Sequence, residues 1–171
     1  MKRLLFFFAV LILFGVPVAI LTVVYHLPLD LADRAPEQPV PFSHALHAGD
    51  YEIDCRFCHR GVSVSPVAGV PPMSTCRSCH LHIATDRPPV QKFMQMIKEN
   101  KPVEWQRLHV LPDHVYFPHM MHMRAGFECS TCHGRVETME IVERQFSPKM
   151  GWCLDCHREH EASIDCWTCH I

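Results

Sequence analysis

The cysteines of this 171-residue chain constrain its fold more than any other feature. All ten fall into five Cys-x-x-Cys pairs, and a histidine directly follows the second cysteine of every pair. In Cys-x-x-Cys-His, both thiols add to the vinyl groups of one porphyrin and the adjacent imidazole binds its iron, so the motif is the attachment signature of c-type haem. The sequence therefore predicts five covalently bound haem c groups. The first to fifth motifs occupy residues 55–59, 76–80, 129–133, 153–157 and 166–170.

The haem interpretation accounts for every cysteine in the chain. A disulfide framework or a set of zinc sites also uses Cys-x-x-Cys pairs, but neither needs a histidine after each pair. An odd number of pairs also does not suit zinc sites built from four cysteines. The predicted covalent attachment residues are Cys55, Cys58, Cys76, Cys79, Cys129, Cys132, Cys153, Cys156, Cys166 and Cys169. The predicted proximal iron ligands are His59, His80, His133, His157 and His170.

The N-terminal segment is typical of a membrane anchor. Lys2 and Arg3 precede an apolar run that extends from Leu4 to about Tyr25, which is long enough to cross a bilayer as a helix. The two basic residues predict that the start of the run stays in the cytoplasm. The run lacks the short core and small-x-small ending of a cleaved signal peptide, so we expect a single-pass transmembrane helix over residues 1–27. The rest of the chain would then lie on the periplasmic or outer face of a bacterial cytoplasmic membrane, where c-type haem is attached and free thiols would otherwise oxidise.

The charge of the exported part excludes nucleic acid as a partner. Without Lys2 and Arg3, the 16 basic residues fall to 14, against 18 acidic ones, and haem propionates add more negative charge. A nucleic-acid-binding surface needs an excess of positive charge to neutralise phosphates. We therefore expect protein and membrane partners only.

Residues 28–41 are rich in proline and predict an extended linker in front of a haem domain over residues 42–171. Five haems in that domain leave about 26 residues for each, so porphyrins rather than side chains would form most of the core. We therefore expect a mostly irregular and α-helical fold. Apolar spacing predicts a packing helix over residues 86–100, and β-prone residues predict a short strand over 103–111 opposite 136–142.

An internal repeat divides the haem domain into two di-haem units and a fifth haem. The unit over residues 42–80 begins with Phe42-x-His44-x-x-His47, and the unit over residues 117–157 begins with Phe117-x-His119-x-x-His122. In each unit the first haem motif follows this phrase, and a methionine stands three residues before the second motif. Each unit thus contains two haem motifs and two spare histidines.

The spare histidines are the predicted distal iron ligands. In His-x-x-His, one helical turn places two imidazoles on neighbouring sides, so one pair can serve two closely spaced haems. Which histidine serves which haem is not readable from the sequence. For the fifth haem we choose His109, which lies in an apolar stretch between the two units. The predicted distal ligands are His44, His47, His119, His122 and His109, and the alternatives for the fifth are His82, His114, His160 or a methionine.

Several phrases of the sequence resemble one family of multihaem proteins. They are PFSHALHAGDYEIDCRFCH, VPPMSTCRSCH, LHVLPDHVYFPHMMH, CSTCHGRVETM and MGWCLDCHRE. They resemble the pentahaem cytochrome c subunit of alternative complex III, over nearly the whole chain. The resemblance implies a subunit of a quinol-oxidising membrane assembly, with an iron-sulfur subunit similar to molybdopterin oxidoreductases, polytopic quinol-binding subunits and often a monohaem cytochrome c as neighbours.

Electron transfer without bond chemistry is the function that the sequence favours, because the spare histidines suffice to close every iron. On the family resemblance, the chain would conduct electrons from the quinol-oxidising complex to a soluble periplasmic acceptor and would not be catalytic alone. A small membrane-anchored multihaem quinol dehydrogenase that feeds a separate periplasmic reductase is the alternative. A multihaem reductase would need an open haem in a cationic pocket, which nothing in the motifs marks.

Overall fold

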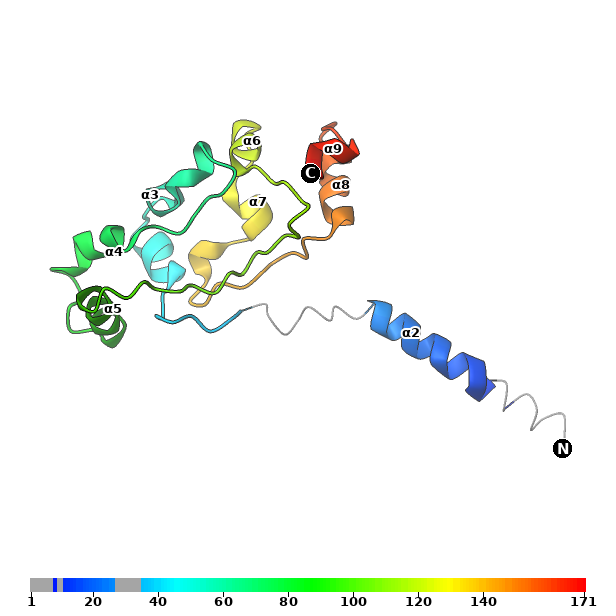
Figure 1. The fold of residues 1–171 in the computed structure, drawn as a ribbon, viewed down its shortest axis with the longest axis horizontal. Helices are drawn as coiled ribbons and strands as arrows, with labels where there is room; N and C mark the ends of the chain where they lie inside the picture. The colour runs from blue at the N-terminus through cyan, green and yellow to red at the C-terminus, as the bar shows by residue number, and fades with distance from the viewer. Residues whose placement is uncertain (1–7, 9–10, 27–34) are drawn as a thin grey trace. The chain divides into compact units, whose positions relative to one another are not determined.

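Short helices separated by irregular chain make up the protein, shown in Figure 1 as a computed structural model that describes residues 8, 11–26 and 35–171. The chain divides into two units, residues 1–33 and residues 34–171. In the first unit, the π-helix η1 (Leu11–Gly15) is followed by α2 (Val16–His26). Within the described residues, no helix is long and apolar enough to cross a membrane. The anchor predicted over residues 1–27 includes residues 1–7, 9–10 and 27, which lie outside the described residues, and so it stays a prediction.

Each haem motif of the second unit lies on its own short helix. The first to fifth motifs lie on α3 (Cys55–Cys58), α4 (Met73–His80), α7 (Cys129–His133), α8 (Met150–Glu159) and α9 (Cys166–Cys169). The other helices are η3 (Ala45–Asp50), η4 (Arg60–Ser63), α5 (Pro88–Lys98), α6 (His119–Arg124) and η5 (Val136–Thr138). The mostly irregular and helical fold is therefore confirmed.

The helix predicted over residues 86–100 is confirmed as α5. Two prolines fit its first turn because their missing N–H groups have no partner there in any helix. Phe93 is 5% exposed and is the buried anchor of its apolar face. The helix ends where Asn100 adopts a positive φ of 52°, just before Pro102.

The strand predicted over residues 103–111 is wrong. Its expected partner forms the 3-10 helix η5 instead, and the only bridge among the described residues outside helices joins Val115 to His170. The backbone of Gln106 pairs with a side chain rather than a strand. The Gln106 N–H donates to Gln38 Oε1 at 2.9 Å, and Gln38 Nε2 donates to the Gln106 carbonyl at 3.1 Å. One amide side chain thus supplies the two hydrogen bonds that a neighbouring strand would have made.

The same contact places the end of the predicted linker on the haem domain. Gln38 lies within residues 28–41, and Val40 is only 6% exposed. The second of the two units begins at residue 34, and the haem domain predicted over residues 42–171 lies within it. This proline-containing segment contacts the domain through the side chains of Gln38 and Val40.

The two repeat units exchange contacts. Helix η3 belongs to the repeat over residues 42–80 and packs against η5, which follows the third motif. Helix α6 belongs to the repeat over residues 117–157 and packs against η4, which follows the first motif. The Ala45 N–H donates to the Met139 carbonyl at 3.0 Å, and the His119 N–H donates to the Pro66 carbonyl at 3.1 Å. The helices with the spare histidines, η3 and α6, thus each pack on the short helix that follows the first haem motif of the other repeat.

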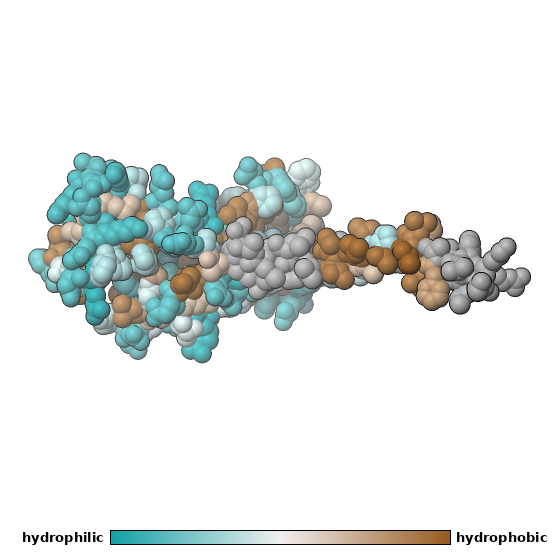
Figure 2. All heavy atoms as spheres, turned by 90° about the horizontal axis from the view of Figure 1, so that it is seen from below, coloured by the Kyte–Doolittle hydropathy of each residue, from teal (hydrophilic) through white to brown (hydrophobic). Residues whose placement is uncertain are grey.

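Few hydrophobic side chains are buried. Among the described residues, they are Val40, Val62 and Phe93. On the face shown in Figure 2, the second unit is mostly hydrophilic with scattered hydrophobic residues. A domain of this length normally buries a larger apolar core. Side chains alone therefore form only a small apolar core, and the core of porphyrins expected from the sequence stays a prediction.

The packing of η3 against η5 requires a residue without a side chain at position 49, which can be tested. A Cβ atom at this position would collide with the Glu137 carbonyl of η5. We expect Gly49→Ala to push η3 from η5 and to lower the free energy of unfolding by about 1–3 kcal/mol. Denaturant titration of the haem-loaded protein measures the change. Gly151→Ala is the matched control, because a Cβ there meets nothing within 4 Å and the residue lies in α8. Equal destabilisation by the two substitutions would contradict the close approach of η3 and η5.

Candidate haem-binding site

Every Cys-x-x-Cys pair forms a single helical turn. Residues three apart on a helix lie on one side, so the turn presents both thiols in the same direction. The α3 turn is capped by Asp54, whose Oδ1 accepts from the Arg56 N–H at 2.8 Å. All ten cysteines are free thiols rather than disulfides. The thiols are therefore placed as covalent attachment to one porphyrin per motif requires.

Four of the five proximal imidazoles are oriented by backbone carbonyls. A carbonyl oxygen can only accept, so the Nδ1 atom of each ring carries the proton and the Nε2 lone pair is left for a metal. Such a hydrogen bond also fixes the ring and makes it a stronger ligand. The Nδ1···O distances are 2.6 Å from His59 to Gly69, 3.1 Å from His80 to Ile83, 2.6 Å from His157 to Ser163 and 3.3 Å from His170 to His114.

The two Phe-x-His-x-x-His phrases have nearly the same geometry. The Phe42 ring meets His44 edge-on at 4.8 Å and 85°, and it stacks on His47 at 4.4 Å and 25°. The Phe117 ring meets His119 at 4.9 Å and 86°, and His122 at 4.4 Å and 31°. One phenylalanine in each unit thus separates two imidazoles and sets their directions. The internal repeat read from the sequence is therefore also a repeat in space.

Backbone carbonyls orient the spare histidines as well. His47 Nδ1 donates to the Ser43 carbonyl at 2.8 Å, and His122 Nδ1 donates to the Pro118 carbonyl at 3.1 Å, four residues back in both cases. His119 Nδ1 donates to Pro66 across the unit boundary at 3.0 Å. These three rings also leave Nε2 available for a metal.

Three predicted distal rings face proximal rings at the spacing of two ligands on one metal. A metal–imidazole bond of about 2 Å, with each ring centre about 1 Å behind its nitrogen, separates the two centres by about 6 Å. The observed centroid distances are 6.1 Å from His47 to His80, 6.4 Å from His119 to His133 and 6.2 Å from His122 to His157. The second, third and fourth motifs thus each face one spare histidine.

His44 lies near the first motif. Burial, and then the neighbouring His59 and His47 rings, lower its pKa to about 4. Its buried Nδ1 has no hydrogen-bond partner. A buried, neutral imidazole is the form that binds a metal.

His109 and His114 are the two candidates for the fifth distal ligand. His109 has a buried ring nitrogen without a hydrogen-bond partner, whereas His114 lies near the fifth motif. Burial lowers the pKa of His109 to about 4, ahead of the effect of His133, and its buried Nε2 has no partner. Its ring is 4.7 Å from His133 at 87°, too close for a porphyrin between them, and it stacks on Phe146 at 5.4 Å. His114, taken from the sequence as an alternative only, lies 5.5 Å from His170 of the fifth motif at 18°. The structure thus brings His114, and not His109, beside the fifth motif.

Electrostatic contacts between thiols show which motifs are neighbours. Burial raises the pKa of five cysteines, and repulsion from a cysteine of another motif raises it further. The pairs are Cys58 with Cys79, Cys76 with Cys58, Cys129 with Cys55, Cys132 with Cys153 and Cys156, and Cys153 with Cys169. The motifs are therefore neighbours in the order second, first, third, fourth, fifth, and Figure 1 shows α4, α3 and α7 in turn, with α8 and α9 together at the other end.

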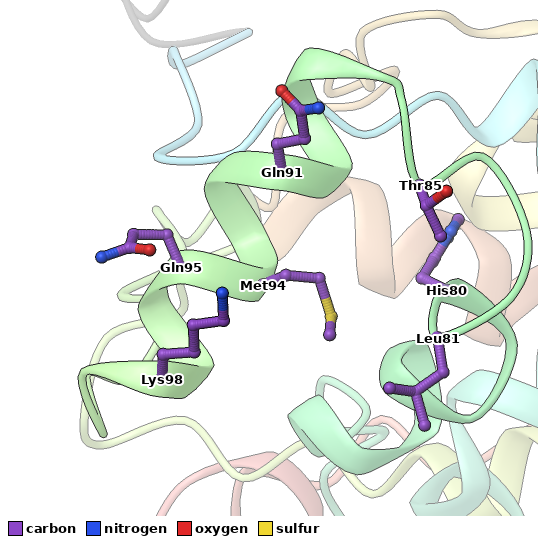
Figure 3. Close-up of a pocket in the computed structure, with 7 residues that line it drawn as sticks. All are labelled: His80, Leu81, Thr85, Gln91, Met94, Gln95 and Lys98. Atoms are coloured by element: carbon purple, nitrogen blue, oxygen red, sulfur yellow. The ribbon is translucent and has the colours of Figure 1, made fainter.

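A pocket of about 350 Å³ lies at the second-motif end of this row. Helix α5 forms one wall and the end of α4 with the following turn forms the other, and Met94 points into the space between them (Figure 3). The lining residues are His80, Leu81 and Thr85 on one side and Gln91, Met94, Gln95 and Lys98 on α5. The pocket thus combines one proximal histidine with amide and ammonium donors.

The residues present fit haem c. Thiols three apart on a turn, adjacent imidazoles with Nδ1 fixed, and spare imidazoles about 6 Å from three of them form the donor set that covalent attachment and two-sided iron ligation need. The scarcity of buried hydrophobic side chains agrees with a core completed by porphyrins.

Comparisons with known proteins agree with this site. Residues 115–171 match the family model described as cytochrome c7 and related cytochrome c. Over 163 aligned residues, the chain is 27% identical to a protein of Nitratidesulfovibrio vulgaris named menaquinone reductase, multihaem cytochrome c subunit. The alignment covers 78% of this chain and 77% of that protein. The family match spans the third, fourth and fifth motifs with the spare histidines of the second unit.

Removing one motif tests the number of haems. We expect the double substitution of Cys166 and Cys169 by alanine to abolish attachment at the fifth motif alone. The intact mass should fall by one haem, and the haem content per protein by one fifth. Mass spectrometry under denaturing conditions and haem absorbance in alkaline pyridine measure both. His82→Ala is the control, since His82 follows a motif without belonging to it. An unchanged mass would show that the fifth motif carries no haem.

Substitution of the two rival histidines tests the fifth distal ligand. We expect His114→Ala to convert about one fifth of the haem to the high-spin form, because the sixth position of one iron opens. His114→Met should restore the low-spin form and raise the midpoint potential of that haem. His109→Ala is the matched variant and should leave all haems low-spin. Visible and electron paramagnetic resonance spectra distinguish these cases, and the opposite pattern would assign the position to His109.

Proposed function

Because the chain is similar to multihaem cytochromes c in its motifs and in the match over residues 115–171, we propose that it is the electron-transfer subunit of a quinol-oxidising membrane complex of the alternative complex III type. In this proposal it carries five haem c groups and delivers electrons to a soluble periplasmic acceptor. The observation that carries the proposal is that each of the five motifs, from α4 to α9, has another motif as its neighbour.

The chain's own residues build this row by holding and orienting imidazoles. When bound, haem c supplies reversible one-electron oxidation and reduction. The backbone carbonyls fix the ring directions, and Phe42 and Phe117 keep the two imidazoles of each pair apart. Distal ligation by His44, His47, His119 and His122, with His114 or His109 for the fifth haem, would close every iron. A chain with no open iron transfers electrons and binds no small substrate at the metal.

The partners and location of the proposal rest on the family resemblance and on the named relative. The relative's name connects it to menaquinone, which supports a quinone-linked complex for this chain too. We propose an iron-sulfur subunit similar to molybdopterin oxidoreductases and polytopic quinol-binding subunits as neighbours, and a monohaem cytochrome c as a further one. The apolar run that begins at Leu4 would anchor the chain in the cytoplasmic membrane, with the haem domain on the periplasmic face.

The pocket beside His80 favours a second candidate function. Its lining combines the apolar side chains of Leu81 and Met94 with Lys98, which would suit an amphipathic ring such as a quinol headgroup. A chain with a quinol site of its own would be a small anchored quinol dehydrogenase that feeds a separate reductase. The packed position of residues 35–41 also removes part of the spacer that would hold the domain away from the membrane.

Isolation in mild detergent separates the two functions. We expect a large particle that contains an iron-sulfur subunit and polytopic subunits, in which a menaquinol analogue reduces the haems, while the same analogue does not reduce the isolated chain. Native mass, subunit composition and absorbance on quinol addition measure this. Lys98→Ala, with Lys92→Ala as the control outside the pocket, should not alter the rate in the intact complex. Reduction of the isolated chain, lost on Lys98→Ala alone, would establish the dehydrogenase instead.

A further inference from the structure

Helix α9 exposes large apolar side chains at one end of the row. Trp167 is 86% exposed, Ile171 is 81% exposed and Ile164 is 50% exposed. On a helical turn, a residue next to the first cysteine projects away from the side that presents both thiols, so the Trp167 ring is not directed at the haem of its own motif. Exposed tryptophan side chains of this kind are typical centres of protein interfaces.

The surroundings of this apolar centre are acidic. Residues 150–171 contain four acidic residues and one basic residue, Arg158. Arg158 is paired with Asp155 at 3.2 Å, so its charge is already matched. The acidic side chains are all exposed, and they are Asp155, Glu159, Glu161 and Asp165.

The opposite end of the row carries the opposite charge. Residues 77–107, which include the end of α4 and all of α5, contain six basic and three acidic residues. The side chains of α8 and α9 thus have a negative excess, and those of residues 77–107 have a positive one. A field of one sign at one end orients an approaching charged protein before contact.

From this asymmetry we propose that the surface formed by Trp167, Ile164 and Ile171 with Glu159, Glu161 and Asp165 is the docking site of a small, basic electron-carrier protein. The inference rests on the proposed function and names the chemistry of its acceptor. The carrier fits if it has an apolar patch around its own redox centre and a rim of lysine side chains. Such a surface has an apolar core and a charged rim, as transient electron-transfer interfaces do.

The proposed surface lies beside the fifth motif, where a bound carrier could exchange electrons with its haem. Helix α9 holds the fifth motif, and Cys169 is the neighbour of Cys153 in the fourth, so the surface lies at the end of the row. A carrier bound there would be next to the last motif, whereas the second motif at the other end has α5 beside it. Weak, charge-steered contact also allows the fast release that a shuttling carrier needs.

Binding to a lysine-rich class I cytochrome c, used as the probe, tests the proposal on the full haem-loaded chain in detergent. We expect saturable binding that weakens steeply with salt. Glu159→Lys with Glu161→Lys should weaken it roughly tenfold or more at low salt. Asp86→Lys with Glu104→Lys, an equal change of charge near the other end, is the control and should have little effect. Trp167→Ala should speed dissociation, with Tyr51→Ala, which removes another exposed aromatic ring, as its control. Calorimetry and stopped-flow measurements give these values.

Three results would overturn the docking site: no binding of the probe, binding that the α8–α9 variants do not change, or equal weakening by the two charge pairs. Reduction of the haems by a menaquinol analogue in the isolated complex is measured on the same variants without the probe. If reduction persists while docking is unaffected, the docking site fails and the electron-transfer function stands. If quinol reduces no haem in the complex, the proposed function itself fails.

Discussion

Everything in the haem domain depends on one local geometry, the helical turn that presents two thiols and an adjacent imidazole together. This turn needs only four or five residues, which explains why α3, α7 and α9 end as soon as their motif is complete. The next carbonyl along the chain, or one brought from a loop, then fixes the imidazole through Nδ1. Many hydrogen bonds of the domain thus orient imidazole rings, instead of forming sheets or long helices. Only three hydrophobic residues are buried among the described residues, which leaves room in the core for the predicted porphyrins.

The exchange between the repeat units explains the spatial order of the motifs. Helix η3 packs on η5 and α6 packs on η4. The first motifs of the two repeats therefore lie next to each other in the middle of the row, with Cys55 and Cys129 as neighbours. The second motif of each unit is then directed outward, to opposite sides. The fifth motif extends the row beyond the fourth. A sequence repeat has therefore become a row that runs second, first, third, fourth, fifth, and no reading of the chain in sequence order would place it so.

Sequence reasoning was strongest where the chemistry is local. The Cys-x-x-Cys-His turns, the Phe-x-His-x-x-His geometry and helix α5 all depend on residues within a few positions of each other, and the spacing alone predicts them. It failed where partners come from far along the chain. Gln38 replaces the strand expected beside Gln106 from 68 residues away, and His114 reaches His170 from 56 residues away. His114 had a weak signal, its place in a short polar stretch before the second unit, but a distal ligand has no spacing rule relative to the motif it serves.

The two ends of the row differ in both shape and charge, and this difference has a physical consequence. The second-motif end has an excess of basic side chains, contacts the amphipathic helix α5 and has a pocket between α5 and the end of α4. The fifth-motif end is acidic and exposes Trp167 and Ile171. Burial under a helix favours a lasting contact with a fixed neighbour, whereas an exposed apolar centre with a charged rim favours brief encounters. Because like charges repel, a basic carrier is also discouraged from the second-motif end. If each motif carries a haem as proposed, a row with such ends would be directional in its partners even though each site could accept or donate an electron, and side chains that bind no haem would set that direction.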